Sequence, residues 1–361
     1  MRIAQIAPLA ESVPPRLYGG TERIVSFLTE ELVRQGHDVT LFASGDSATA
    51  AKLVACCGSA LRLDPTIHDP LPQHLLMLDR VRRRAEEFDI LHFHVDLLHY
   101  PIMTAWSGRT LTTLHGRLDR VDGHELYAAF DDFPLVSISH HQRLPMPPVR
   151  WAATVHHGLP VDLLPFTARP AGGYLAFLGR ISPEKRPDRA IEIARRAGLP
   201  LKIAAKVDRA DQPYWTEVIE PMIRGNPDVD FVGEIGEREK ARFLGDALAL
   251  VFPIDWPEPF GLVMIEAMAC GTPVVAFAGG SVPEVIDDGV TGAIVGSIEE
   301  AVVALPRALA LDRAAIRATF ERRFSAERMA RDYVGLYRDL VGADRPRALV
   351  RRFGERAPLS M

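Results

Sequence analysis

The residues best suited to chemistry lie in two segments of the second half of this 361-residue chain. The first segment runs from Gly179 to Pro187 and contains Arg180 and Lys185, between an apolar run and a helical pattern. Ligands of open α/β sheets bind beyond the carboxyl ends of the strands, where helix N-termini expose backbone N–H groups. A forked guanidinium and an ammonium there can neutralise a diphosphate. The alternative is a pair of solvated surface charges, and the strand-loop-helix context favours the first interpretation.

The second segment, from Glu258 to Pro273, carries two carboxylates in different settings. Pro259 and Gly261 keep Glu258 outside the helix, whereas Glu266 lies on it among apolar residues. Burying a carboxylate without partners costs several kcal/mol, so Glu266 is not an ordinary surface residue. It either caps a neighbouring loop or accepts two vicinal hydroxyls, as from a ribose. We favour the second role.

A third candidate is the turn Gly19-Gly20-Thr21, which follows the first apolar run. Glycines allow the backbone to approach a phosphate or sugar, and Thr21 is placed to cap the next helix. The plain alternative is a flexible turn. The turn lacks the G-x-G-x-x-G spacing, which argues against a nicotinamide enzyme.

These loops must be positioned by two α/β domains. Apolar runs alternate with helical periods, which is typical of parallel sheets flanked by helices, and the length suits two domains. Periodicity fails between His157 and Gly173, where prolines and glycines accumulate as in a linker. We predict an acceptor domain over 1–160, a nucleotide-sugar domain over 161–325, and a crossover helix with a tail over 326–361. The basic tail, 345–361, is expected to be partly disordered.

The expected elements follow from the same patterns. Strands are predicted at 3–8, 39–43, 90–94, 111–115, 135–139, 154–156, 174–178, 201–205, 230–232, 248–252 and 273–277. The principal helices are predicted at 24–36, 188–197, 298–311, 313–323 and 326–341.

Composition narrows the class of protein. Apolar residues make up 47% and charged residues 25%, which is typical of a globular protein. A net charge of -5 gives no sign of the basic surface that binds nucleic acid. Cys56, Cys57 and Cys270 form neither a disulfide framework nor a zinc spacing. No signal peptide or apolar run of membrane-spanning length is present, so we predict a cytoplasmic protein. The arginines between 80 and 84 leave peripheral contact with an anionic membrane open, although a solvated face is the commoner meaning.

In combination, these motifs resemble the retaining GT-B glycosyltransferases of family 4. The resemblance rests on Glu258 and Glu266 with seven residues between them, the Gly-Arg-x-x-x-Glu-Lys loop from Gly179, the Gly-Gly turn, and the strand entry from Gly271 to Ala276. It extends to about Val341. It implies two Rossmann-like domains with parallel sheets, and a C-terminal helix that returns to the N-terminal domain.

The resemblance also implies roles for individual residues. Arg180 and Lys185 would hold the diphosphate, Glu266 the ribose and Glu258 the donor sugar. His115 would face the sugar from the acceptor side. The remaining donor-binding positions would be Gly19, Gly20, Gly233, Ile235, Phe260, Gly261 and Leu262. The chain departs from the usual pattern of this family at two places, from His157 to Asp162 at the domain junction and at Lys206 after a strand. These departures leave the identity of the donor open.

A metal site is the main alternative for the polar cluster His92, His94, Asp96 and His99. Alternation points His92 and His94 to the same side of a strand. We favour a cleft-facing strand end, with His94 and Asp96 near acceptor hydroxyls. Asp131-Asp132 is interpreted as a loop. We therefore predict no cofactor and no essential metal.

The predicted function is a metal-independent, retaining transfer of a sugar from a UDP- or GDP-sugar to an acceptor hydroxyl. The acceptor could be a saccharide, a lipid-linked compound or a small molecule. Same-face attack is favoured over a covalent intermediate. Two rivals are a sugar-nucleotide epimerase, which would turn over the donor without an acceptor, and a catalytically silent sugar-nucleotide binding protein.

Overall fold

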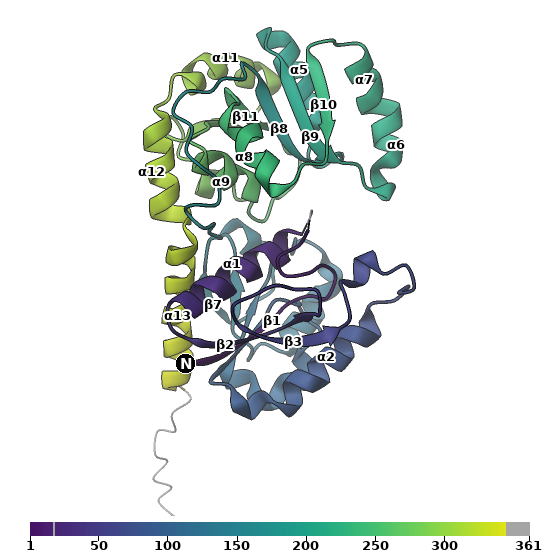
Figure 1. Ribbon diagram of the computed structural model, residues 1–361, viewed down its shortest axis with the longest axis vertical. Helices are drawn as coiled ribbons and strands as arrows, with labels where there is room; N and C mark the ends of the chain where they lie inside the picture. Colours follow the sequence, from purple (N-terminus) through teal and green to yellow (C-terminus); the bar gives the residue numbers. More distant parts are fainter. Residues whose placement is uncertain (17–18, 344–361) are drawn as a thin grey trace, which may run out of the picture.

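The computed structural model describes residues 1–16 and 19–343 and contains two stacked α/β domains (Figure 1). The N-terminal domain is built on a seven-stranded parallel sheet in the order β3-β2-β1-β4-β5-β6-β7. Its strands are β1 (Arg2–Ile6), β2 (Asp38–Ser44), β3 (Lys52–Cys57), β4 (Ile90–Phe93), β5 (Thr110–Thr113), β6 (Leu135–Ser137) and β7 (Trp151–Thr154). Its α-helices are α1 (Gly20–Arg34), α2 (Leu71–Arg83), α3 (Tyr100–Met103) and α4 (His124–Ala129).

The C-terminal domain is built on a six-stranded parallel sheet in the order β10-β9-β8-β11-β12-β13. Its strands are β8 (Leu175–Arg180), β9 (Leu201–Lys206), β10 (Val229–Gly233), β11 (Ala249–Phe252), β12 (Val274–Phe277) and β13 (Gly292–Val295). Its α-helices are α5 (Pro187–Ala197), α6 (Gln212–Tyr214), α7 (Glu220–Arg224), α8 (Glu237–Gly245), α9 (Leu262–Ala269), α10 (Val282–Val285), α11 (Ile298–Leu309) and α12 (Arg313–Phe324). The central strands β11 and β12 are buried along their whole length, as parallel strands covered on both faces must be.

Two parallel sheets with Rossmann-like domains confirm the predicted fold class. The sequence analysis missed both β3 and β13, which are edge strands. Both carry short apolar runs, but β3 is largely exposed and β13 has only four residues. The prediction that Thr21 caps the first helix was wrong, because α1 begins at Gly20 and has no side-chain cap.

The predicted domain boundaries stay predictions, although the first sheet ends at Thr154 and the second begins at Leu175. The predicted tail, 345–361, lies outside the described residues.

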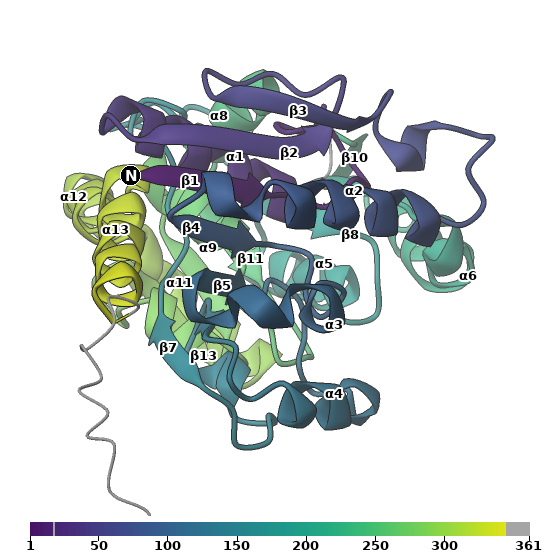
Figure 2. The ribbon, with the colours of Figure 1, turned by 90° about the horizontal axis from the view of Figure 1, so that it is seen from below.

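The long helix α13 (Ala326–Ala343) returns from the C-terminal to the N-terminal domain, as predicted, and packs on α1 (Figures 1 and 2). Where it starts, Leu159 N–H donates to the Phe324 carbonyl at 2.9 Å, and Ala326 N–H donates to the Leu159 carbonyl at 2.8 Å. The two segments that connect the domains therefore lie side by side. A Cβ at Gly158 would stand 2.3 Å from the Ser325 carbonyl oxygen, so only glycine fits this crossing.

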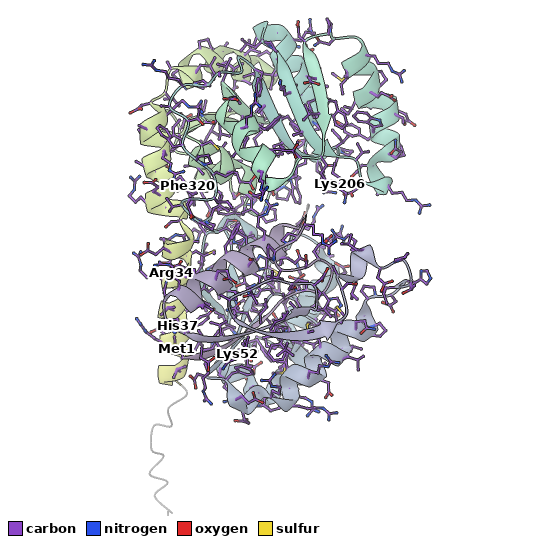
Figure 3. All side chains as sticks on the ribbon, viewed as in Figure 1. Met1, Arg34, His37, Lys52, Lys206 and Phe320 are labelled. Atoms are coloured by element: carbon purple, nitrogen blue, oxygen red, sulfur yellow. The ribbon has the colours of Figure 1, made fainter. Side chains whose placement is uncertain are left out.

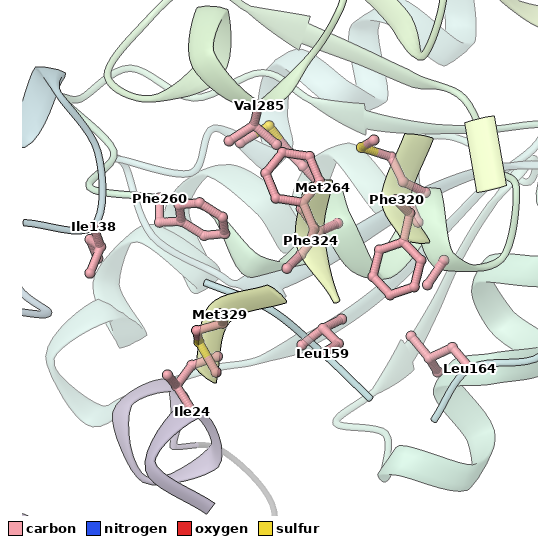
Figure 4. Close-up of a cluster of buried hydrophobic side chains, with 14 of the residues drawn as sticks. Ile24, Ile138, Leu159, Leu164, Phe260, Met264, Val285, Phe320, Phe324 and Met329 are labelled. Carbon is pink, nitrogen blue, oxygen red and sulfur yellow. The ribbon is translucent and has the colours of Figure 1, made fainter. Parts of the chain in front are cut away.

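One apolar cluster runs through the junction of the domains (Figure 4). Phe324 packs against Phe260 with ring centroids 6.1 Å apart, and Leu159 belongs to the same buried cluster. Met329 of α13 and Ile24 of α1 continue it into the N-terminal domain. The side of the molecule on which the two connecting segments cross is thus held together by a hydrophobic core that both domains share.

None of the helices in the described part of the chain is long and apolar enough to cross a membrane. The arginine run near the end of α2 is largely neutralised within its own segment. Arg82 and Arg83 pair with Asp79, and Arg84 pairs with Glu87. This agrees with a solvated face.

The shared core gives a stability prediction. We expect Phe324→Ala to lower the free energy of unfolding by about 3–5 kcal/mol, because it removes a fully buried ring and leaves a cavity. Val303→Ala on α11 is the control, since its side chain is 80% exposed and its loss should cost less than about 0.5 kcal/mol. Urea denaturation of both variants checks this. If both variants lost an equally small free energy of unfolding, the apolar cluster at the domain junction would have no structural role.

Candidate active site

A cleft of about 460 Å³ lies between the domains, beyond the carboxyl ends of both sheets. Eleven of the predicted site residues line it: Gly19, Gly20, His115, Arg180, Lys185, Ile235, Glu258, Phe260, Gly261, Leu262 and Glu266. Gly233 does not line it, whereas His94 and Asp96 line a second, smaller cavity beside it. Lys206, noted in the sequence only as a departure, also lines the cleft, at the edge of the C-terminal domain that faces the N-terminal one (Figure 3).

Arg180, at the end of β8, lies among carboxylates. Its guanidinium is 3.5 Å from Asp208, 3.6 Å from Asp211 and 3.7 Å from Glu184. Lys206, at the end of β9, pairs with Asp208 at 2.9 Å. Adjacent parallel strands thus end with cations at the same edge, which is the arrangement that an anionic ligand requires.

Lys185 and Glu258 form an ion pair inside the cleft. The Trp256 indole N–H also donates to Glu258 at 3.0 Å, and the Lys185 ammonium lies 4.8 Å from the centre of the Trp256 ring. The backbone of Glu258 is closely packed, since a Cβ at Gly280 would lie 2.2 Å from the Glu258 carbonyl oxygen. Glu258, one of the two predicted site carboxylates, is therefore fixed beside Lys185, the residue predicted to bind a diphosphate.

Glu266 is buried on α9 and is held by cations from both domains. The Lys240 ammonium donates to its carboxylate at 2.7 Å and the Arg23 guanidinium at 3.0 Å. Burial alone would raise the pKa of Glu266, but the two cations outweigh it and hold the pKa below its ordinary value. Arg23 comes from α1, so this contact joins the domains across the cleft.

His115 follows β5 and begins a buried polar chain. Its Nε2 lies 2.8 Å from His94 Nδ1, and His94 Nε2 lies 2.8 Å from Gln5 Oε1. Burial lowers the pKa of His115 to about 3, and it lowers the pKa of His94 well below its ordinary value. Both imidazoles are therefore neutral at pH 7.

The hydrogen-bond directions follow from the Gln5 carbonyl oxygen, which can only accept. His94 must then donate through Nε2 and accept at Nδ1, so His115 donates through Nε2. His115 Nδ1 is left with a lone pair and has no hydrogen-bond partner among the residues that the structure describes. A residue in the wall of the cleft therefore carries an unsatisfied acceptor nitrogen whose ring orientation the chain fixes.

The same chain reaches the returning helix α13. The Gln5 amide donates to the Tyr337 hydroxyl at 3.1 Å, which lies 2.7 Å from His92 Nδ1. Tyr333, one turn earlier, bonds Thr113 at 2.9 Å. His92 is thus part of this buried hydrogen-bond network and not an isolated metal ligand. No group of three or more potential ligands is arranged for a metal ion within the described ranges.

The sequence analysis missed several cleft residues. Arg23 and Lys240 hold Glu266, and Arg117 bridges the domains through Glu184 at 2.8 Å. A usable signal existed for Gln5, because it is a polar residue inside an otherwise apolar first strand. No comparable signal marks Arg23 or Lys240, which look like ordinary charges on helices.

Comparison with known families agrees with this geometry. The profile described as "Glycosyl transferases group 1" matches residues 169–319, and that described as "Glycosyltransferase Family 4" matches residues 18–154. The chain belongs to glycosyltransferase family 4. It is therefore a member of a family of transferase enzymes, and the resemblance drawn from the motifs is confirmed.

Curated relatives include proteins named D-inositol 3-phosphate glycosyltransferase. The one from Mycobacterium leprae is 33% identical over 54% of this chain and 46% of its own length. The one from Salinispora arenicola is 30% identical over 50% of this chain and 44% of its own length. The matched region thus spans about half the length of these relatives.

Solved structures share the fold. Sucrose-phosphate synthase from Thermosynechococcus elongatus has a TM-score of 0.77 at 19% identity and covers 95% of this chain and 100% of its own. Anabaena HepE in complex with UDP has a TM-score of 0.73 at 16% identity and covers 93% of this chain and 99% of its own. These neighbours support the GT-B architecture of two Rossmann-like domains.

The buried Glu266 cluster gives a pH-dependent prediction. We expect Glu266→Gln to lower the free energy of unfolding by about 3 kcal/mol at pH 7, because the buried Lys240 loses its nearest carboxylate, at 2.7 Å, and keeps only the more exposed Glu237 at 3.6 Å. The folded-state pKa of Glu266 is lowered, so its stabilisation is present above the unfolded pKa near 4.3 and is lost as the pH falls through the folded value. The difference from wild type should shrink below about pH 4.

Glu237→Gln is the matched control. Glu237 also approaches Arg23 at 3.3 Å and Lys240 at 3.6 Å, but its side chain is 34% exposed. We expect it to cost less than about 1 kcal/mol. Urea denaturation at pH 7 and at about pH 3 checks both variants, and equal losses at pH 7 would mean that Glu266 is not the anchor of the cluster.

Proposed function

We propose that this protein transfers a sugar from a UDP- or GDP-sugar to an acceptor hydroxyl. The observation that carries the proposal is the convergence of Arg180, Lys185 and Lys206 in one cleft with Glu258 and Glu266. Three cations suit a diphosphate, and the two carboxylates suit hydroxyl groups on either side of it. Free thiols at all three cysteines suit a reducing compartment, so a cytoplasmic location is part of the proposal.

The cations and helix ends provide the electrostatic part of catalysis. As the bond between sugar and diphosphate breaks, negative charge grows on the departing oxygen, and fixed positive groups stabilise it. The N-terminal residues of α1 and α9, Gly20 and Leu262, line the same cleft and add the partial positive charge of helix ends. We infer that the reaction needs no metal ion.

We propose retention of anomeric configuration by attack on the face from which the diphosphate leaves. Glu258 is engaged by Lys185 and Trp256, which suits a sugar contact better than a nucleophile. The acceptor oxygen bonds to the anomeric carbon as the bond to the diphosphate breaks, and the acceptor proton passes to the departing diphosphate. In this proposal the unsatisfied His115 Nδ1 accepts a hydrogen bond from a hydroxyl of the reacting sugar.

The test is sugar transfer in the presence of EDTA, with UDP-sugars tried first because structural neighbours are named as UDP complexes. We expect product of retained configuration in the proton NMR spectrum, and a rate that EDTA leaves within about twofold. Loss of transfer that Mg²⁺ or Mn²⁺ restores would overturn metal independence. Donor conversion without any acceptor would indicate an epimerase, and donor binding with neither transfer nor hydrolysis a silent binder.

The two glutamates should separate in function. Glu266→Gln should weaken bare UDP and whole donor alike, by about 10- to 100-fold, because it loses hydrogen bonds between a charged group and the ribose. Glu258→Gln should leave UDP affinity within about threefold and lower kcat about 100-fold, since a contact to the reacting sugar strengthens in the transition state. Calorimetry and initial rates measure the contrast. Equal loss of UDP affinity in both variants would refute this division of roles.

A further inference from the structure

A second cavity of about 310 Å³ opens beside the donor cleft in the N-terminal domain. The two cavities share Pro8, Thr21, His115 and Gly116 in their walls. The second cavity therefore meets the cleft at His115, where the transferred sugar would lie. An acceptor in it would be next to the reacting carbon.

Asp96 is the charged group of this cavity. Its carboxylate has no hydrogen bond or ion pair to any residue in the described part of the chain. Its backbone is left-handed, with φ of 50°, which is uncommon for residues other than glycine and marks functional sites. The side chain is exposed to solvent at the mouth of the cavity, and partial desolvation by the surrounding protein raises the pKa of Asp96 to about 6. At neutral pH the carboxylate is mainly ionised.

Among the residues that the structure describes, none that lines the cavity carries a positive charge to balance Asp96. His74 accepts a hydrogen bond from Leu9 N–H at Nε2, at 3.1 Å, and its Nδ1 lies 2.8 Å from the Pro70 carbonyl. An imidazole that accepts at one nitrogen is neutral. His94 and His115 are neutral for the reasons given above.

Lysine and arginine are absent from the described residues that line this cavity. Arg62, which lines the neighbouring donor cleft, is paired with Glu11 at 2.9 Å. The cavity thus presents hydroxyl-binding groups and net negative charge. A phosphate group placed in it would meet the Asp96 carboxylate and find no cation to pair with.

We propose that this cavity is the acceptor subsite and that it takes an uncharged polyol or saccharide, with Asp96 accepting a hydroxyl, while it excludes phosphorylated acceptors. The inference rests on the proposed function of the adjoining cleft. It separates this chain from its curated relatives, whose name specifies a phosphorylated inositol. Fold and donor chemistry can be common to the family while the charge of the acceptor cavity differs.

The test uses protein saturated with UDP, so that the diphosphate site is filled and a phosphorylated compound can enter only the second cavity. Matched pairs are added: myo-inositol with myo-inositol 3-phosphate, and glucose with glucose 6-phosphate. Binding is measured by calorimetry in the presence of UDP. Transfer is measured by mass spectrometry in separate reactions, in which a UDP-sugar replaces UDP. For wild type we expect the unphosphorylated member of a pair to bind or accept sugar at least tenfold better. For Asp96→Lys we expect the affinity or the transfer rate of the phosphorylated member to rise at least tenfold.

Asp96→Asn removes the charge and suits the left-handed backbone, so it serves if the lysine variant does not fold. It should narrow the discrimination within a pair. Asp230→Lys, on an exposed residue of β10, makes the same change in net charge in the other domain and should change nothing.

Each outcome decides the inference. Tenfold preference of wild type for a phosphorylated member overturns it, as does failure of both Asp96 variants to shift the preference. If wild type binds neither member, a gain of phosphate binding in Asp96→Lys supports the inference and no gain overturns it. Failure of the protein to bind any nucleoside diphosphate would instead remove the proposed function, and this is measured before the pairs are added.

Discussion

The arrangement of the molecule depends on the short backbone bridge between Leu159 and Ser325, where the two connections between the domains meet. The connections are held together by two backbone hydrogen bonds and by the buried ring of Phe324. They can approach so closely because Gly158 has no side chain. This contact sets where the carboxyl ends of the two sheets face each other. Without it, Arg23 of one domain would not reach Glu266 of the other, and the cleft would lack one of its walls.

The bridge also directs α13 back over the first sheet. There Tyr333 and Tyr337 enter the buried chain that runs through Gln5 and His94 to His115. Buried polar groups stabilise a structure only when nearly all are satisfied, and in this chain His115 Nδ1 is left without a partner among the described residues. The returning helix therefore does more than cover the sheet, since it helps to fix the orientation of a residue in the site.

Charge differs between the two cavities of the site. The donor cleft is lined by cations at the ends of β8 and β9 and by arginines of the N-terminal domain, in keeping with a diphosphate, whereas the second cavity presents neutral imidazoles and the Asp96 carboxylate. Such a division separates two kinds of ligand by charge at short range. It gives a physical reason why relatives on one fold can share a donor and differ in the acceptor.

The sequence by itself determined the two parallel sheets, the order of most elements and the loops that carry Arg180, Lys185, Glu258 and Glu266. Apolar runs, helical periods and glycines at strand ends are local patterns, and local patterns are visible in one dimension. Only the tertiary structure decided that Glu266 is held by Arg23 and Lys240, and that Gln5 orients His115 through His94. It also decided that no cation from the described part of the chain lines the cavity of Asp96. These facts depend on contacts between residues far apart in the chain. The energies of buried charges are set by such neighbours, and a sequence pattern does not contain them.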